Sequence, residues 1–396
     1  MNNNQQVLVS VENIAPDNGT ALTPFWGGFH NGEFDTYDRG RPASPGLERI
    51  AEDGNPEAFN QEFDLSGLGD AQAVVAGPNG PIVPGETGEL LVDVSDPAEA
   101  GRYFNYAAMV LPSNDIFVAN GNPTAHAIFD ARGRFIGAVF VIAGQQVLDA
   151  GTEINDEIPE NTAFFGQTEA DTGVEENGVI SLSEGFNPGG NILSTPRFSN
   201  ADFTQPGYEL ARVRVFNAVT GEGADDTLRG TGKDDYLAGN EGDDTLFGRT
   251  GNDRIVGGEG NDRLFGQGGD DELIGGAGDD KLFGNAGDDI LSGGAGNNIL
   301  RDFSGDNTFV LSADGFADIR GFDDGDRSSL GTSLQFSEVE ITQSNRSAVI
   351  SLEGQMVEKD ALLREKDRLE GTGKVKLKAK GKTEIEKGGR MEKDKA

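Results

Sequence analysis

Aspartate recurs at every ninth residue over one stretch of the chain, and this spacing is the strongest chemical signal in the sequence. Carboxylates are hard oxygen donors, and because the stretch has neither histidine nor cysteine, the donor set favours calcium over zinc or copper. We therefore predict Ca²⁺ as the cofactor. The predicted ligands are the carboxylates of Asp226, Asp235, Asp244, Asp253, Asp262, Asp271, Asp280 and Asp289.

The aspartates belong to a nine-residue unit, G-x-x-G-x-D-x-L-x, which is repeated nine times from Gly221 to Arg301. The eighth place always holds Leu or Ile, which predicts a short strand with one inward apolar side chain. If one coil takes two units, carboxylates eighteen residues apart stack on one wall, and each neighbouring pair can hold one ion. A flexible linker is the alternative, but a linker would not keep an apolar residue at every ninth place.

These units resemble the calcium-binding nonapeptide repeats of RTX proteins, which bacteria export through type I secretion channels. The resemblance implies a parallel β-roll that folds around calcium after export, with the secretion signal near the C-terminus. The pattern departs at its ends, where Ala224 and Lys233 occupy the fourth place and Asn298 the sixth. We expect these terminal units to be caps or weaker sites.

The residues before the repeats predict an antiparallel β-sandwich. Short alternating runs such as Val7–Val11, Leu90–Val94 and Phe135–Ile142 are separated by Gly, Pro, Asn and Asp. One helix is expected over 43–54, with Ser44 as its N-cap and proline at its first position. The predicted fold class is therefore all-β, a sandwich followed by a parallel β-roll solenoid with a C-terminal cap.

Two acidic turns in the predicted sandwich each follow an apolar, strand-like run. One turn contains Asp115, and the other contains Asp149 and Glu153. Carboxylates on neighbouring loops can chelate a cation, and this arrangement suits calcium. The alternative is that these residues only form turns, since Asp and Asn commonly hydrogen-bond their own backbone there.

The same region resembles a spondin domain, especially its bacterial branch. That resemblance implies a sandwich similar to a calcium-dependent membrane-binding module, with calcium held at Asp115, Asp149 and Glu153. The chain departs from animal spondin domains at Ile116, where they have Trp, and at Glu153, where they have Asp. The motifs that carry the resemblance are Leu22–Pro24, His30, Ala43–Leu47, Ala51–Gly54, Ser113–Asp115 and Asp149–Glu153.

The sequence divides into four parts. We predict a sandwich over 5–218, the β-roll over 221–301, a capping and secretion-signal region over 302–370, and a basic tail over 371–396. Within the third part, we expect a hairpin with strands at Val339–Gln343 and Ala348–Leu352, followed by a charged helix over Val357–Glu370. The tail has nine basic and four acidic residues and is expected to be disordered, or else to dock on an acidic or anionic surface.

Composition excludes several functions. The formal charge of −36 repels nucleic acids, so we expect no nucleic-acid partner. The absence of cysteine excludes disulfides and zinc–thiolate sites. We expect no transmembrane segment and no N-terminal export signal, since no run is apolar enough. Export through a type I channel would place the protein outside the cell or at its surface.

Enzyme motifs are missing from the sequence, so we expect a protein that is not an enzyme. There is no H-E-x-x-H and no G-x-S-x-G. We expect a secreted adhesion or matrix protein whose spondin-like domain recognises cell-surface glycans or lipid. The alternative is a secreted hydrolase with an unfamiliar active site in the sandwich. Its candidate residues are Asp149, Glu153, Asp156 and Glu157.

Overall fold

The structure is a computed structural model, and its chain divides into two compact units, Met1–Asn217 and Ala218–Ala396. The structure describes residues 5–159, 162–163, 165, 167, 174–302, 304–312, 315–321 and 325–330. In addition, it describes the backbone of the strands at 338–344, 347–352, 363–364 and 374–378.

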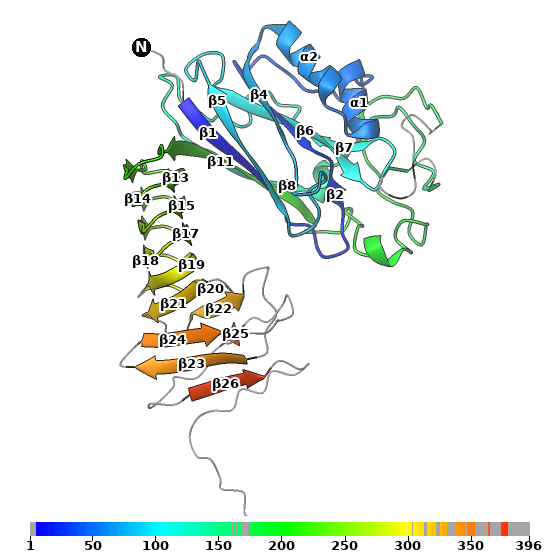
Figure 1. Cartoon of the computed structure of the whole chain (residues 1–396). Coiled ribbons are helices and arrows are strands. Elements are labelled where there is room, and N and C mark those ends of the chain that lie inside the picture. Colours follow the sequence, from blue (N-terminus) through cyan, green and yellow to red (C-terminus); the bar gives the residue numbers. More distant parts are fainter. Residues whose placement is uncertain are drawn as a thin grey trace, which may run out of the picture. The chain divides into compact units, whose positions relative to one another are not determined.

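The first unit contains two antiparallel sheets that face each other (Figure 1). One sheet has the order β5-β1-β11-β8, and the other has the order β10-β9-β7-β6-β3-β4, with β2 paired to β6. The strands of the first sheet are β1 (Gln5–Asn13), β5 (Thr87–Val94), β8 (Ala138–Ala143) and β11 (Glu209–Thr220). Those of the second are β2 (Ala21–Leu22), β3 (Phe25–His30), β4 (Gly69–Val75), β6 (Tyr103–Leu111), β7 (Ile116–Ala119), β9 (Leu148–Asp149) and β10 (Ser181–Leu182).

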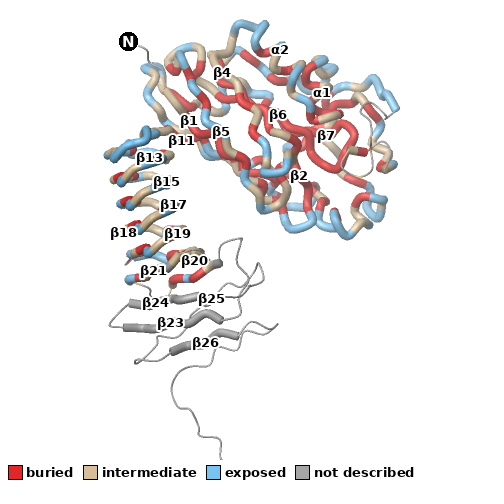
Figure 2. Tube along the Cα trace, viewed as in Figure 1, coloured by how far each residue is buried: buried red, intermediate tan, exposed pale blue. Residues whose placement is uncertain are grey.

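Alternation along the strands makes the core of this sandwich. Val9 of β1 lies opposite Val215 of β11, and both belong to the same buried core as Phe25 and Phe29 of the facing sheet. Figure 2 shows buried residues along strands of both sheets. The structure therefore has the two-layer β architecture that the alternating runs predict.

Two helices cover part of the second sheet. Helix α1 (Pro45–Asp53) begins as predicted, since the Ser44 hydroxyl accepts a 3.2 Å hydrogen bond from the Leu47 amide. Helix α2 (Glu57–Ser66) was not predicted. Its Phe59 and Phe63 lie on one face and pack edge-on against Trp26.

The second unit contains a β-solenoid of about six turns, whose parallel strands stack in two walls (Figure 1). Each strand pairs with the strand eighteen residues later, as Leu246 with Leu264 and Ile255 with Leu273. One coil therefore takes two units, as predicted. The strands are β12 (Thr227–Arg229), β13 (Asp235–Glu241), β14 (Thr245–Thr250), β15 (Arg254–Glu259), β16 (Arg263–Gly268), β17 (Glu272–Ala277), β18 (Lys281–Ala286) and β19 (Ile290–Arg301).

Parallel stacking continues beyond Arg301, the last residue of the predicted nine-residue repeats. Strands β20 (Thr308–Leu311), β21 (Gly315–Arg320) and β22 (Arg327–Leu330) continue the parallel stacking. The stacking requires an apolar residue at the inward place of each strand, and it continues where the rest of the nine-residue motif is missing. Phe309 and Ile319 take that place and are buried below Leu291 and Leu300.

Antiparallel strands follow the roll. The predicted hairpin is confirmed, since β23 (Glu338–Ser344) pairs with β24 (Ser347–Leu352), which in turn lies antiparallel to β21. Where the helix was expected, Leu363–Arg364 form the short strand β25, and the rest of 357–370 lies outside the described residues. In the expected disordered tail, Lys374–Lys378 form β26, paired with β23, because lysine alternates there with Val and Leu. The rest of the tail also lies outside the described residues.

Candidate metal centre

The sixth-place aspartates form a ladder on each wall of the roll. On one wall, Asp271 Oδ1 accepts a hydrogen bond of 2.8 Å from the backbone amide of Asp253, one coil earlier. On the other wall, Asp262 Oδ1 accepts one of 2.8 Å from the amide of Asp244. The ladder continues through the same bond to Asn298 and Asn307, at 2.9 Å each. An asparagine at this place therefore keeps the ladder.

The second carboxylate oxygen of most of these aspartates is buried without a hydrogen-bond partner in the described structure. Such an oxygen is costly to bury as an anion, since the protein supplies no donor in place of water. A cation bound at the oxygen would remove this cost. The oxygens are the Oδ2 atoms of Asp244, Asp253, Asp262, Asp271, Asp280 and Asp289.

The first-place glycine of each unit makes room for this oxygen. A Cβ atom built on Gly266 would overlap Asp271 Oδ2 and would lie 2.9 Å from the carbonyl oxygen of Gly284. Carboxylate and carbonyl oxygens thus surround the same small space at the turn. We call this space beside the first-place glycine the glycine cradle. Six to eight oxygen ligands of this kind are what calcium prefers. The donor set and the space fit calcium, and a residue with a Cβ at position 266 would overlap Asp271 Oδ2.

The fourth-place glycine is required by stacking. Gly260 has a φ of +127°, and a Cβ there would overlap the carbonyl oxygen of Gly242 in the coil before. The first coil has no earlier coil of the roll to meet, which explains why Ala224 and Lys233 are tolerated. The expectation that the units of these two residues are caps or weaker sites stays a prediction.

Burial makes the stacked carboxylates weak acids. Burial, together with the like charges of neighbouring aspartates, raises the pKa of Asp253 to about 7 and that of Asp271 to about 8. Burial also raises the pKa of Asp262 and Asp280 to about 6 each. The folded roll without a cation therefore disfavours the charged form of these residues.

The predicted ligands do not all have the same surroundings. In the first coil, Asp226 Oδ2 accepts a hydrogen bond of 2.9 Å from the Glu222 amide. Asp235 Oδ2 accepts hydrogen bonds from the amide and hydroxyl of Thr231, at 2.5 and 3.0 Å. These two carboxylates are thus satisfied by their own turns, unlike the six in later coils.

A second ladder, at the fifth place, was not predicted. Asp243 Oδ1 accepts a hydrogen bond of 2.8 Å from the amide of Asn261, one coil later, so this ladder runs in the opposite direction to the sixth-place one. Its side chains are exposed, except that Asp234 is partly buried. The signal was present in the sequence, because every unit has Asp or Asn at the fifth place. The ladder residues are Asp225, Asp234, Asp243, Asn252, Asn261, Asp270, Asp279 and Asp288.

In the sandwich, Asp115 and Asp149 lie together around Asn155. The Asn155 amide group donates to Asp115 Oδ1 at 3.0 Å and to Asp149 Oδ2 at 2.9 Å. Asp115 Oδ2 also accepts from the amides of Thr152 and Glu153, at 2.9 and 3.0 Å. These bonds occupy the buried Asp115 carboxylate and favour the turn-forming interpretation. The role of Asp115, Asp149 and Glu153 as calcium ligands stays a prediction.

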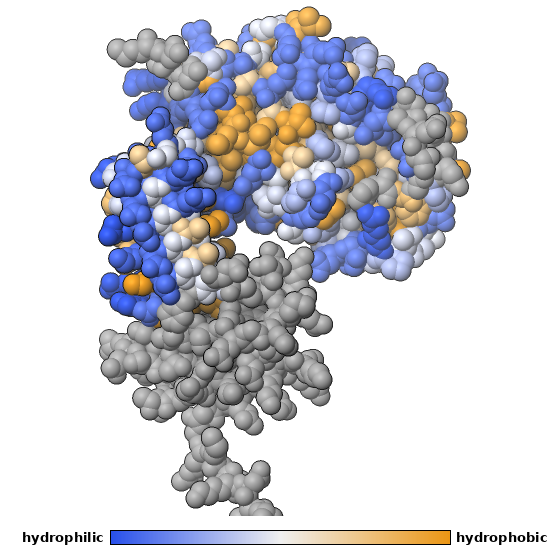
Figure 3. Space-filling view, viewed as in Figure 1, coloured by the Kyte–Doolittle hydropathy of each residue, from blue (hydrophilic) through white to orange (hydrophobic). Residues whose placement is uncertain are grey.

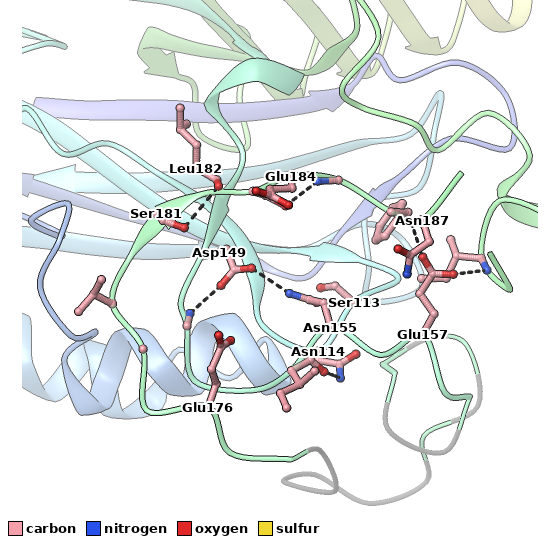
Figure 4. Close-up of a pocket in the computed structure, with 18 residues that line it drawn as sticks. Ser113, Asn114, Asp149, Asn155, Glu157, Glu176, Ser181, Leu182, Glu184 and Asn187 are labelled. Atoms are coloured by element: carbon pink, nitrogen blue, oxygen red, sulfur yellow. Dashed lines mark hydrogen bonds between the residues drawn. The ribbon is translucent and has the colours of Figure 1, made fainter. Parts of the chain in front are cut away.

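A pocket of about 590 Å³ lies beside these loops (Figure 4). Asp149, Glu157, Glu176 and Glu184 are among its lining residues. Glu157 is 5% exposed, and its carboxylate accepts hydrogen bonds from the amides of Asn187 and Ile192, at 2.5 and 3.2 Å. It therefore holds a loop in place.

The hydrolase alternative draws on the same acidic residues. Asp156 accepts a hydrogen bond of 2.9 Å from the Ile158 amide, as a turn residue does. Burial, followed by the charge of Asp115, raises the pKa of Asp149 to about 6. Asp149 and Glu157 line the pocket, whereas Asp156 and Glu153 are not among its lining residues.

In the described part of the chain, no three acidic or histidine side chains converge as metal ligands. A site in the roll would therefore combine two carboxylates with backbone carbonyls, as the glycine cradle allows. Among the described residues, no helix is long and apolar enough to cross a membrane.

Comparison with protein families identifies the repeats. The model of the RTX calcium-binding nonapeptide repeat matches four overlapping segments, 220–255, 247–282, 265–300 and 283–314. A comparison with curated proteins finds none that matches the chain. Repeats of this kind bind calcium, form β-rolls and are typical of proteins exported by type I secretion. The β-roll of this chain is thus built from RTX calcium-binding nonapeptide repeats.

Proposed function

We propose that this is a secreted, non-catalytic protein whose β-roll folds when it binds calcium outside the cell. The observation that carries the proposal is the set of six buried Oδ2 atoms without a hydrogen-bond partner in the described roll. Each pair of stacked carboxylates, such as Asp253 and Asp271, would hold one ion together with first-place carbonyl oxygens. The ion would supply the positive charge that the buried carboxylates need.

Calcium concentration would then control where the roll folds. Extracellular calcium modules bind at about 10⁻⁴ to 10⁻³ M, far above cytosolic calcium levels. The roll would stay unfolded inside the cell, pass a type I channel, and fold outside. Deleting residues 303–396 should stop export, because we place the signal there. Export that continues without these residues would contradict this part of the proposal.

For the sandwich, we propose recognition of a surface, either cell-surface glycans or lipid, in an adhesion or matrix role. The spondin-like motifs support this, as do exposed aliphatic side chains on its four-stranded sheet. Leu90 and Leu91 of β5 are 41% and 40% exposed, and Val139 of β8 is 55% exposed. Figure 3 shows apolar surface on the visible face of the sandwich and mainly hydrophilic surface on the roll.

Glycan arrays and vesicles, each with calcium and with chelator, would test surface recognition with the full-length protein. We expect retention on one of the two, and Leu91→Asp and Val139→Asp should weaken it. Retention on neither would contradict the proposal, as would hydrolysis of the bound polysaccharide or of ester substrates.

The predicted calcium ion of the sandwich has its own test. Asp115→Asn should lower the calcium count of the full-length protein by one if Asp115 is a ligand. If Asp115 only organises its turn, as its hydrogen bonds favour, the count will not change and the sandwich will unfold more easily even in chelator.

A further inference from the structure

The tenth unit of the roll, 302–310, differs from the nine-residue motif at two places that carry the predicted chemistry. Its sixth place holds Asn307, so this coil lacks the usual carboxylate of its wall. Its first place holds Asp302, where each of the nine units before has glycine. One carboxylate is thus lost and another gained within the same unit.

The side chain of Asp302 lies at the turn where a sixth-place carboxylate is also found. A Cβ atom built on Gly284 would overlap both Asp289 Oδ2 and Asp302 Oδ2. In the unit two before, the atoms nearest to a Cβ built on Gly266 belong to the Asp271 carboxylate and to the backbone carbonyl of Gly284, with no second carboxylate among them. Two carboxylate oxygens therefore share one cradle at Gly284.

Both carboxylates of this pair are buried, at 1% exposure each. Asp302 Oδ2 accepts a hydrogen bond of 3.0 Å from the Asn285 amide, and Asp302 Oδ1 accepts one of 3.1 Å from the Ser304 amide. Asp289 Oδ2 has no hydrogen-bond partner in the described structure. The amides orient Asp302 but bring no net charge, so two buried anions face each other without a cation.

We propose that Asp289 and Asp302 hold one further calcium ion at the C-terminal end of this wall, with Asp302 replacing the carboxylate that Asn307 lacks. The inference rests on the proposed function and extends it to a site that the sixth-place pattern does not contain. The donors are two carboxylates and nearby backbone carbonyl oxygens, a hard-oxygen set that suits calcium.

The opposite wall supplies an internal comparison. There the sixth place holds Asn298, and the residue eighteen after the first-place Gly293 is Leu311, which is buried and has no side-chain oxygen. The atoms nearest to a Cβ built on Gly293 all belong to the Asn298 side chain, and none is a carboxylate oxygen. The column of carboxylate pairs therefore ends one step earlier on that wall.

The test counts calcium ions bound per full-length chain by equilibrium dialysis near neutral pH. Asp302→Asn and Asp302→Gly should each bind one ion fewer than the unmodified protein, and glycine is the residue that the other units have at this place. Asp306→Asn is the matched control, since Asp306 lies in the same unit but is exposed, and it should bind the full number. An unchanged count in both Asp302 variants would overturn the inference in favour of a shared proton.

A second measurement does not depend on the variants folding. In a crystal structure of the unmodified protein with calcium, an anomalous peak should lie about 2.3–2.6 Å from oxygens of both Asp289 and Asp302. Peaks between other stacked aspartates but none here would refute this site alone. If the unmodified protein binds no calcium at all, the proposed function itself is wrong.

Discussion

Asp271 and Asp253 lie one coil apart on the same wall, and Asp271 Oδ1 accepts a hydrogen bond of 2.8 Å from the Asp253 amide. This bond fixes the Asp271 carboxylate so that Oδ2 is turned into the glycine cradle. Consecutive strands are about 5 Å apart. At that distance two like charges repel by about 3 kcal/mol with an effective dielectric constant of 20. A calcium ion bound by both carboxylates would replace their mutual repulsion with attraction of each to the ion. Ion binding would thereby be coupled to folding.

Asp271→Asn should weaken calcium binding and shift the calcium midpoint of folding upward by about tenfold or more. Asparagine keeps the ladder hydrogen bond, as Asn298 does, but loses the charged Oδ2. The neighbouring change Asp270→Asn is the control, because Asp270 is exposed and belongs to the fifth-place ladder, which accepts asparagine. Calcium titrations monitored by circular dichroism measure both. Equal midpoints in the two variants would count against Oδ2 as a ligand.

Calcium binding should depend on pH. The pKa values of Asp253 and Asp271 are raised to about 7 and 8, so protons compete with calcium below these values. The calcium midpoint should therefore rise by about tenfold as pH falls from 8 to 6. Without calcium, these two carboxylates bind protons more tightly in the folded roll than in the unfolded chain. Their protonation therefore stabilises the folded roll near pH 4, and this stability is lost as the pH rises through 7 to 8. A calcium midpoint that stays constant over this pH range would contradict the raised pKa values of the buried carboxylates.

Gln267→Gly should stabilise the calcium-loaded roll by about 1 kcal/mol. Gln267 occupies the second place with a φ of +83°, which strains a residue that has a Cβ. The opposite change, Gly258→Ala, should destabilise the roll, because a Cβ there would overlap the Asn240 carbonyl oxygen. Native-state hydrogen exchange of roll amides gives both changes in opening free energy. If Gln267→Gly destabilises the roll, the positive φ of Gln267 does not strain the backbone.

Three phenylalanines stack at the ninth place of one wall. Phe265 lies between Phe247 and Phe283, with ring centroids 5.0 and 4.8 Å away and ring planes 9° and 6° apart. Phe265→Leu should lower stability by about 1 to 3 kcal/mol, because two stacking contacts are lost while apolar contact remains. Ile274→Leu at the ninth place of the opposite wall is the control and should change stability less. Equal losses would indicate that the stack adds nothing beyond burial.

The nine-residue period predicted the roll because one constraint recurs at each place of the unit. The inward residue, such as Leu264, and the ladder residue, such as Asp262, were both identified from spacing alone. Asp302 could not be found this way, since its importance depends on its approach to Asp289 in three dimensions. Similarly, the second helix was missed because Phe59 and Phe63 give only one i,i+4 pair, too short a pattern to distinguish from a loop.

Hydrogen exchange of the full-length protein tests the central claim most directly, because it resolves the roll from the sandwich. In millimolar calcium, amides of residues 235–301 should be protected, and in excess chelator or with magnesium alone they should exchange as in an unfolded chain. Amides of β1 and β6 in the sandwich should stay protected in every condition and so serve as the internal control. Equal protection of the roll in calcium and in chelator would contradict calcium-coupled folding.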